Sequence, residues 1–168
     1  MPVTYDELIT YTVPSNTGSV TLGSGGQGTI SQSYTDLIAI VTSKDTRSGS
    51  GLVCDLTLRW NGYTTGYNYG VINDAGGFRG SNGTLFPMAH PGNGDQPSTS
   101  IWQFSNYTNN RNKQCIGQIA SMYGSNGNVR IGTCNNTSAS AAITSITWIG
   151  EQGIASGSVF KLYGILEA

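Results

Sequence analysis

Apolar and polar residues alternate along much of this chain with the period of two that is typical of β-strands. In GLVCDLTLRW, apolar residues hold every second position from Leu52 to Trp60, whereas Asp55, Thr57 and Arg59 lie between them. One row of side chains is therefore expected to enter a core and the other to face solvent. The strand is expected to end at Asn61-Gly62, a dipeptide suited to a turn with positive φ.

Two further segments are apolar on both faces. DLIAIVTS, which begins at Asp36, is a continuous apolar run that is rich in β-branched residues and too short for a typical helix. The last segment, Ser158–Leu166, carries Phe160 on one face and Val159 and Ile165 on the other. Both patterns predict interior strands that are covered on both faces.

Shorter apolar segments separated by Gly, Asn and Pro complete the pattern. Further strands are predicted at Ile9–Val13, Ser19–Leu22, Tyr67–Ile72, Ser100–Tyr107, Gln114–Tyr123, Asn128–Cys134 and Ile143–Ile149. GSNGN is expected to join two of them as a hairpin, whereas the Gly- and Pro-rich stretch from Asn73 to Pro97 is expected to lack regular structure. About eight to ten short strands, without a convincing helix, predict an antiparallel β-sandwich or barrel.

Length and charge narrow the range of partners. At 168 residues the chain fits one domain over residues 1–168, in which residues 1–8 are expected to form at most a short N-terminal arm. Charged residues make up only 10% of the chain and its formal net charge is −1, so neutral polar residues must supply most of the surface. The Lys and Arg residues are scattered, which predicts no binding to nucleic acid. We also expect no membrane anchor, because no apolar run is long enough to span a bilayer, and no secretion, because the start lacks a signal pattern.

The cysteines do not form a recognisable site. Cys54, Cys115 and Cys134 are odd in number, and none has C-x-x-C or zinc-type spacing. We expect free thiols and no metal site. A disulfide between Cys115 and Cys134 on neighbouring strands is the alternative, but a chain without a secretory signal is expected to fold in a reducing cytosol.

Groups that could perform catalysis are sparse. His90 is the only histidine and lies between turn residues, with no G-x-S-x-G element to supply a nucleophile. The carboxylates are too few and too dispersed to nominate the opposed pair of a glycosidase. GSGGQG lacks the Lys and Ser or Thr of a phosphate-binding loop. We therefore expect neither a catalytic site nor a cofactor.

Aromatic residues are the remaining candidates for binding, since Tyr and Trp are enriched at interfaces and also stack on sugars. The three tryptophans, Trp60, Trp102 and Trp148, are expected in the core. Several tyrosines lie in a predicted Gly-rich hairpin, where either a core position or a partner contact fits. The candidate partner contacts are Tyr63, Tyr67, Tyr69, Phe86 and Tyr107.

Three segments together resemble a set of small virion proteins of tailed bacteriophages. They are YTVPSNTGSVTL (residues 11–22), SYTDLIAIVTS with the later LTLRWNG (within residues 33–62), and AAITSITW with the later GSVFKLYGI (within residues 141–165). Members of that set share a start of this kind, a YTDL strand, an L-x-x-N-G strand end and a finish of the form ITSI…GS-x-F-x-LYGI. The resemblance implies a jelly-roll-like β-sandwich without catalytic motifs, built into the phage particle as an oligomer, with a homotrimer expected. It does not cover the region from Asn73 to Pro97.

Two placements in the virion follow from this resemblance. A capsid decoration or cement protein would bind the outer shell, with the major capsid protein as its partner, after assembly in the host cytoplasm. A tail-fibre or receptor-binding component would present the loop from Asn73 to Pro97 to a host glycan. We favour decoration, because residue 1 leads almost directly into the first strand. A free carbohydrate-binding module and an enzyme are the alternatives from other classes.

Overall fold

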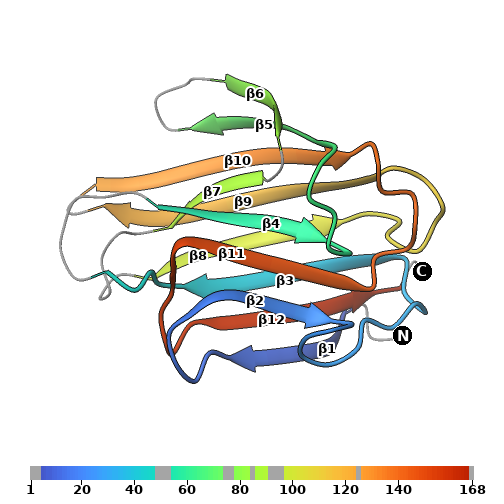
Figure 1. The fold of residues 1–168 in the computed structure, drawn as a ribbon, viewed down its shortest axis with the longest axis horizontal. Helices are drawn as coiled ribbons and strands as arrows, with labels where there is room; N and C mark the ends of the chain where they lie inside the picture. Colours follow the sequence, from blue (N-terminus) through green and yellow to red (C-terminus); the bar gives the residue numbers. More distant parts are fainter. Residues whose placement is uncertain are drawn as a thin grey trace.

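Twelve β-strands follow one another in the computed structural model, which describes residues 5–47, 54–73, 78–83, 86–90, 97–123 and 126–166 and contains no helix in those ranges (Figure 1). Within them, residues 54–55, 73, 78–83, 86–90, 122–123 and 126–128 are described by their backbone alone. The strands are β1 (Tyr5–Thr12), β2 (Thr17–Gly23), β3 (Asp36–Ser43), β4 (Cys54–Trp60), β5 (Tyr67–Asn73), β6 (Phe78–Gly83), β7 (Phe86–His90), β8 (Ser98–Phe104), β9 (Lys113–Tyr123), β10 (Asn126–Asn136), β11 (Ser145–Ile154) and β12 (Val159–Ile165).

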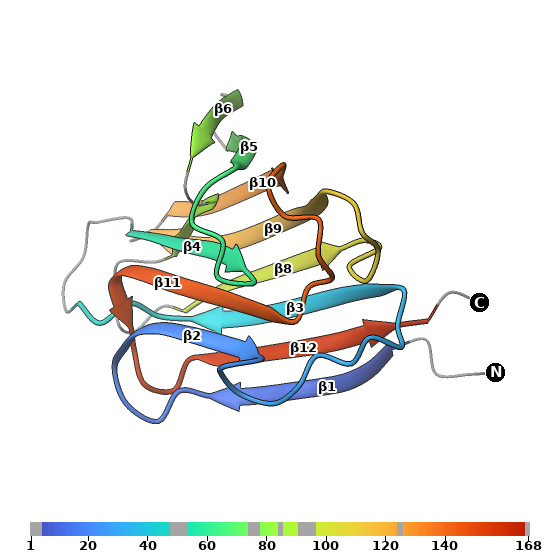
Figure 2. The same ribbon diagram turned by 45° about the vertical axis from the view of Figure 1, so that its right-hand side comes forward.

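These strands form two antiparallel sheets that pack face to face. The larger has eight strands in the order β1-β12-β3-β8-β9-β10-β5-β6, and the smaller has four in the order β2-β11-β4-β7; we call them the large sheet and the small sheet. Figures 1 and 2 show the small sheet lying across one face of the large sheet. The prediction of an all-β antiparallel sandwich is therefore confirmed.

The pairing has the nested order of a jelly roll. β1 pairs with β12, β2 with β11, β3 with β8 and β4 with β7, as in one long hairpin rolled into two sheets. Two hairpins are inserted into this plan, β5-β6 between β4 and β7, and β9-β10 between β8 and β11. Both insertions join the large sheet, which raises the number of strands above the predicted range and makes the large sheet twice as wide as the small one.

Aromatic rings fill the core between the sheets. Trp60, Trp102 and Trp148 are fully buried, as their positions in the alternating pattern predict. The Trp60 ring centroid lies 5.0 Å from that of Tyr67 and 6.1 Å from that of Phe104, both in edge-to-face geometry. Such pairs add about 0.5–1.5 kcal/mol beyond the burial of their area. The two sheets thus share one aromatic-rich interior.

Two of the motifs that carry the resemblance pack directly on each other near the start of β3. Tyr34, just before β3, lies over Gly164 of β12, where an added Cβ would come within 2.4 Å of the tyrosine ring. The Tyr34 hydroxyl donates a hydrogen bond to Asp6 Oδ2 at 2.8 Å, which links the ring to β1. The tyrosine of SYTDL and the glycine of LYGI are therefore two parts of one contact.

The turn after β4 matches its sequence prediction. Asn61 has φ 51° and Gly62 φ 69°, both in the left-handed region. The Asn61 amide nitrogen donates to the Ala142 carbonyl at 2.7 Å, and its amide oxygen accepts from the backbone N–H of Thr144 at 2.8 Å and of Ser145 at 3.2 Å. Asn61 thereby ties the end of β4 to the segment that enters β11.

Four predictions about the strands need correction. β3 and β12 are interior strands, but only one face of each is covered, and Ile38, Ile40, Val159 and Ile165 are half-buried. The reason is that the small sheet packs on one face of the large sheet only. In the expected arm over residues 1–8, Tyr5, Asp6 and Glu7 pair with β12 as part of β1, whereas residues 1–4 lie outside the described residues.

The connections in the middle of the chain also differ from the prediction. β4 and β5 do not form a hairpin, because β4 belongs to the small sheet and β5 to the large one. The stretch from Asn73 to Pro97 contains β6 and β7, which were not predicted. Each forms an edge of its sheet. Edge strands tolerate Gly and Pro, because one side of the backbone needs no ladder hydrogen bonds.

Candidate interaction face

The outer face of the large sheet carries a row of aliphatic side chains. Along β8 and β9 every second residue is buried, and the residues between them are exposed. Large aliphatic residues occupy several outward positions on five neighbouring strands, exposed on β8, β9, β10 and β5 and half-buried on β3. They are Ile40, Ile101, Ile116, Ile131 and Ile72, which we call the isoleucine band.

Strand register places the members of the isoleucine band on adjacent strands. Ile40 lies directly opposite Ile101, and Ile131 lies directly opposite Ile72. On β9 the residue directly between Ile101 and Ile131 is Gln118, and Ile116 lies diagonally from both isoleucines, because its direct partners are Gln103 on β8 and Thr133 on β10. Cross-strand and diagonal neighbours on one face are close enough for such side chains to touch.

The exposure of these side chains is unusual. Ile116 is 52% exposed, Ile72 53%, Ile131 47% and Ile101 45%, and the neighbouring Val129 is 58% exposed. Single exposed aliphatic residues need no explanation, but a contiguous group on one face marks a surface that contacts another molecule. The isoleucine band is therefore the strongest candidate for an interaction surface on the described part of the chain.

Charge is nearly absent from the centre of this face. The outward positions of β8, β9, β10 and β5 whose side chains are described carry Thr, Ile, Gln, Ala, Val, Asn and Gly. Charges lie at the β1-β12 side, where Lys161 Nζ is 3.9 Å from Glu7 Oε2 and the Tyr163 hydroxyl donates to the same Glu7 oxygen at 3.3 Å. Asp36 lies at the end of β3 and accepts hydrogen bonds from Gln103 and the Asn106 backbone N–H.

The outer face of the small sheet is different. Thr21 and Thr147 share a hydrogen bond of 2.9 Å between their hydroxyls, and the Thr57 hydroxyl donates to the Ile149 carbonyl at 3.1 Å. Arg59 lies beside Thr147 in the register of β4 with β11. This mixture of polar and charged side chains is typical of a sheet that faces water. Among the described strands, only the large sheet exposes a group of large aliphatic side chains on its outer face.

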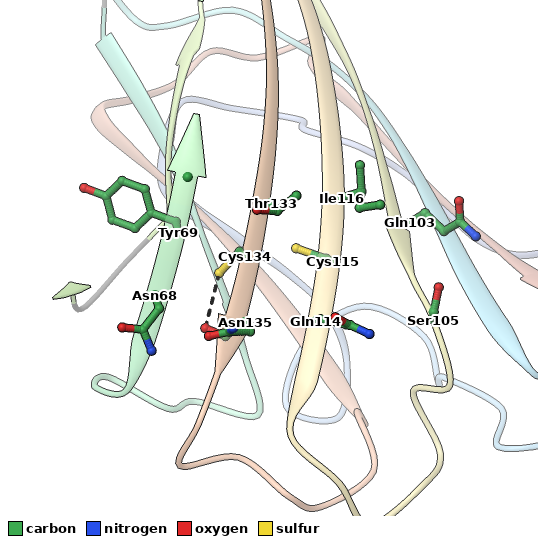
Figure 3. Close-up of a pocket in the computed structure, with 11 residues that line it drawn as sticks. Asn68, Tyr69, Gln103, Ser105, Gln114, Cys115, Ile116, Thr133, Cys134 and Asn135 are labelled. Carbon is green, nitrogen blue, oxygen red and sulfur yellow. Dashed lines mark hydrogen bonds between the residues drawn. The ribbon is translucent and has the colours of Figure 1, made fainter. Parts of the chain in front are cut away.

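A hollow of about 490 Å³ adjoins the isoleucine band on the large sheet. Figure 3 shows that its lining comes from β5, β10, β9 and β8, together with Ser105 just after β8. Ile116 and Thr133 belong to this lining and lie at the boundary with the isoleucine band. The polar side chains of the lining are neutral amides and hydroxyls, from Asn68, Gln103, Ser105, Gln114, Thr133 and Asn135. A neutral ligand rich in hydroxyl groups, or the surface of another protein, fits this lining.

The aromatic residues predicted from sequence as partner contacts differ in how deeply they are buried. Tyr67 and Tyr107 are core residues, 1% and 0% exposed, so they are not available to a partner and this part of the prediction is corrected. Both hydroxyls form hydrogen bonds with backbone groups of the same chain. The Tyr67 hydroxyl accepts from the Trp60 backbone N–H at 3.1 Å, and the Tyr107 hydroxyl donates to the Ser31 carbonyl.

The remaining three candidates are only partly placed. Tyr63 and Tyr69 are half-buried and pack against the core, and Tyr69 also lines the hollow. The side chain of Phe86 lies outside the described residues, although its backbone belongs to β7. The isoleucine band was not predicted from the sequence. Its signal was nevertheless present, because β8, β9 and β10 carry isoleucine at positions that alternate with their core residues.

Two cysteines lie beneath this face. Cys115 and Cys134 are buried free thiols directly opposite each other on β9 and β10. Burial, with a smaller contribution from Cys134, raises the pKa of the Cys115 thiol well above its ordinary value. Cys115 is therefore protonated near neutral pH and a weak nucleophile. The side chain of Cys54, like that of His90, lies outside the described residues.

No protein-family model, no curated protein and no solved structure matches this chain. In the ranges that the structure describes, no three His, Cys, Asp or Glu side chains are grouped so that they could hold a metal ion. Over the same ranges, no helix is long and apolar enough to cross a bilayer.

Proposed function

We propose that this protein is a structural component of a tailed-bacteriophage particle, in the role of a capsid decoration protein that binds the outer shell and stabilises it. The observation that carries the proposal is the exposed isoleucine band on a neutral sheet face. A face of this kind is suited to a lasting contact with protein. The role is structural and not catalytic.

The resemblance to phage virion proteins supports the same role. Its motifs fall on β1 to β4, β11 and β12, all of which belong to the jelly roll, and none falls on the inserted hairpins. The contact between Tyr34 and Gly164 gives a physical reason for two of the motifs to occur together. The resemblance therefore rests on a set of strands that depend on one another.

The chemistry of the face suits a permanent contact. Salt screens interactions between exposed charges, whereas burial of apolar area and hydrogen bonds between neutral groups depend little on ionic strength. A decoration protein with this face would hold the shell over a wide range of salt concentrations. Its partners would be the major capsid protein and further copies of this chain, for which a homotrimer is expected from the resemblance.

Electron microscopy of the phage particles that carry this chain tests the proposal. Density for a two-layer sandwich at icosahedral positions on the capsid is the expected result. Particles made without the chain should lose their capsid contents at a lower temperature than complete particles. Adding the purified protein back before heating should restore the higher temperature. Density at the tail would support the tail-fibre alternative, and particles that lack the chain altogether would overturn both placements.

Carbohydrate binding is the second candidate function, and the amide-lined hollow on the large sheet favours it. Neutral amide and hydroxyl side chains are the groups that hydrogen-bond sugar hydroxyls. A glycan array with the purified protein tests this candidate. Binding that is lost in Gln114→Ala, with Gln118→Ala on the same strand as control, would support it.

A further inference from the structure

We infer that the outer face of the large sheet is covered by a second copy of this chain, with the isoleucine band at the centre of the contact. This inference deepens the proposed function by naming the surface and its occupant. It is tested on the purified chain without any phage particle. The inferred self-association and the proposed role in the virion can therefore fail separately.

The first argument is the mismatch between the sequence pattern and the covering of β3 and β12. Continuous apolar runs are typical of strands that are buried on both faces. In the single chain only the inner residues, such as Leu37 and Leu162, are fully buried, and the outer ones, such as Ile38 and Ile40, are half-exposed. A second copy on the outer face would complete the burial that the sequence predicts.

The second argument is charge. A two-fold contact places a surface against itself, so any unpaired charge near its centre would meet its own like charge. The described outward positions of β8, β9, β10 and β5 carry no charge, and the one charged direct neighbour of the isoleucine band is Lys161 on β12, opposite Ile40. Lys161 forms an ion pair with Glu7 of the same chain, so the positive charge beside β1 already has a negative partner. The face is thus complementary to a copy of itself, whereas a charged partner would find no opposite charge at its centre.

The third argument is size. Neighbouring strands are about 4.8 Å apart and each residue rises about 3.4 Å, so six strands of seven residues present a footprint of roughly 700 Å². The strands from β12 to β5 through β3, β8, β9 and β10 supply such a face. A stable interface buries about 800 Å² on each partner, which is close to this footprint. The face is large enough to hold two copies together without further contacts.

The mass of the purified chain in solution tests the inference. Light scattering after size-exclusion chromatography should give twice the 17.7 kDa of one chain, because a two-fold contact joins two copies through the same face. In the double variant Ile116→Glu with Ile131→Glu, each copy would bring two charges into the contact. This variant should elute at the mass of one chain, with an unchanged β-sheet circular dichroism spectrum.

A matched control places the same charges elsewhere. Ser19→Glu with Gln152→Glu alters two exposed residues on β2 and β11, in the small sheet, and should keep the mass of the oligomer. If the glutamate variant of the isoleucine band fails to fold, Ile116→Thr with Ile131→Thr keeps β-branched residues at both sites. We expect it to weaken association at least tenfold in sedimentation equilibrium.

Three results would overturn the inference. They are a wild-type chain that stays at the mass of one copy into the high micromolar range, a folded glutamate variant that keeps the oligomer mass, and threonine substitutions that leave the association constant unchanged. A monomeric wild-type chain that binds capsids would assign the isoleucine band to the capsid protein instead.

Discussion

Gly117 on β9 offers a sharp test of the core, because the structure leaves no room for a side chain there. A Cβ at this position would lie 2.7 Å from Cε3 and 2.8 Å from Cζ3 of Trp102, its direct partner on β8. Carbon atoms pack best at about 3.5–4.0 Å, so Gly117→Ala requires the indole to move by roughly 1 Å. Trp102 is fully buried, and its indole N–H donates to Ser100 Oγ at 3.0 Å, so this movement also strains a hydrogen bond.

The expected cost follows from two opposing effects. Overpacking of a core typically destabilises by about 1–3 kcal/mol. Replacing Gly by Ala also lowers the entropy of the unfolded chain, which raises the free energy of unfolding by about 0.4–1 kcal/mol. We expect a net loss of about 2 kcal/mol for Gly117→Ala, since the overpacking acts on a rigid buried ring. In a domain of this size that loss lowers Tm by about 4–8 °C.

Thermal and urea unfolding, followed by far-ultraviolet circular dichroism at one protein concentration, measure this loss. A fixed concentration is needed because self-association would shift Tm. Gly18→Ala on β2 is the matched control, because nothing lies within 4 Å of a Cβ there, and its stability should change by no more than about 0.5 kcal/mol. Trp102→Phe should partly relieve Gly117→Ala, so that the double variant loses about 1 kcal/mol less than the sum of the single losses. Equal stability of Gly117→Ala and wild type would refute this account of the core.

Three further results are expected from groups described above. Burial raises the pKa of Tyr67 from 10.0 to about 12, so the folded protein holds this proton more tightly; its contribution to stability should be complete below pH 10 and lost as the pH rises through 12. Tyr67→Phe should therefore flatten the fall of stability with pH in that window, and an equally steep fall would contradict the assignment. Asn61→Ala should cost about 2–3 kcal/mol in urea unfolding, because it leaves the N–H groups of Thr144 and Ser145 without their acceptor, and a loss below about 0.5 kcal/mol would argue against that network. Cys115 should resist alkylation near neutral pH until the protein is unfolded, as mass spectrometry of labelled peptides would reveal; rapid labelling of the folded chain would show that its thiol is not buried.

The sequence predicted the strands whose alternation is strict. β8 is buried at every second residue; Trp102 and Phe104 on either side of Gln103 predict its inner face, whereas buried Ser100 and exposed Ile101 run against the pattern. The three tryptophans were placed in the core for the same reason. Tyr67 and Tyr107 were harder to assign, because a hydroxyl favours the surface unless a buried partner is available. The Ser31 carbonyl that meets Tyr107 lies 76 residues away in the chain, and the Trp60 N–H that meets Tyr67, although only 7 residues away, belongs to the other sheet, so local sequence does not reveal these partners.

Pairing between distant strands was the part that could not be predicted. β4 and β5 are separated by a short turn, which is typical of a hairpin, yet they enter different sheets. β4 pairs with β7 and β11, and β5 pairs with β6 and β10, so the sheet that each strand joins depends on partners farther along the chain. β6 and β7 were missed because Gly and Pro lower strand propensity, although edge positions remove most of the penalty.

The two inserted hairpins explain why the large sheet has such a broad outer face. A jelly roll with four strands in each sheet would leave two faces of equal width, each crossed by few strands. Here β9, β10 and β5 carry Ile116, Ile131 and Ile72, so most of the isoleucine band lies on inserted strands. The jelly-roll strands β3 and β8 supply only Ile40 and Ile101. A chain without the insertions would lose most of this apolar surface, whereas its core between the sheets would keep Trp60, Trp102 and Trp148. The insertions therefore supply the surface for association, and the eight nested strands supply the aromatic core on which it is built.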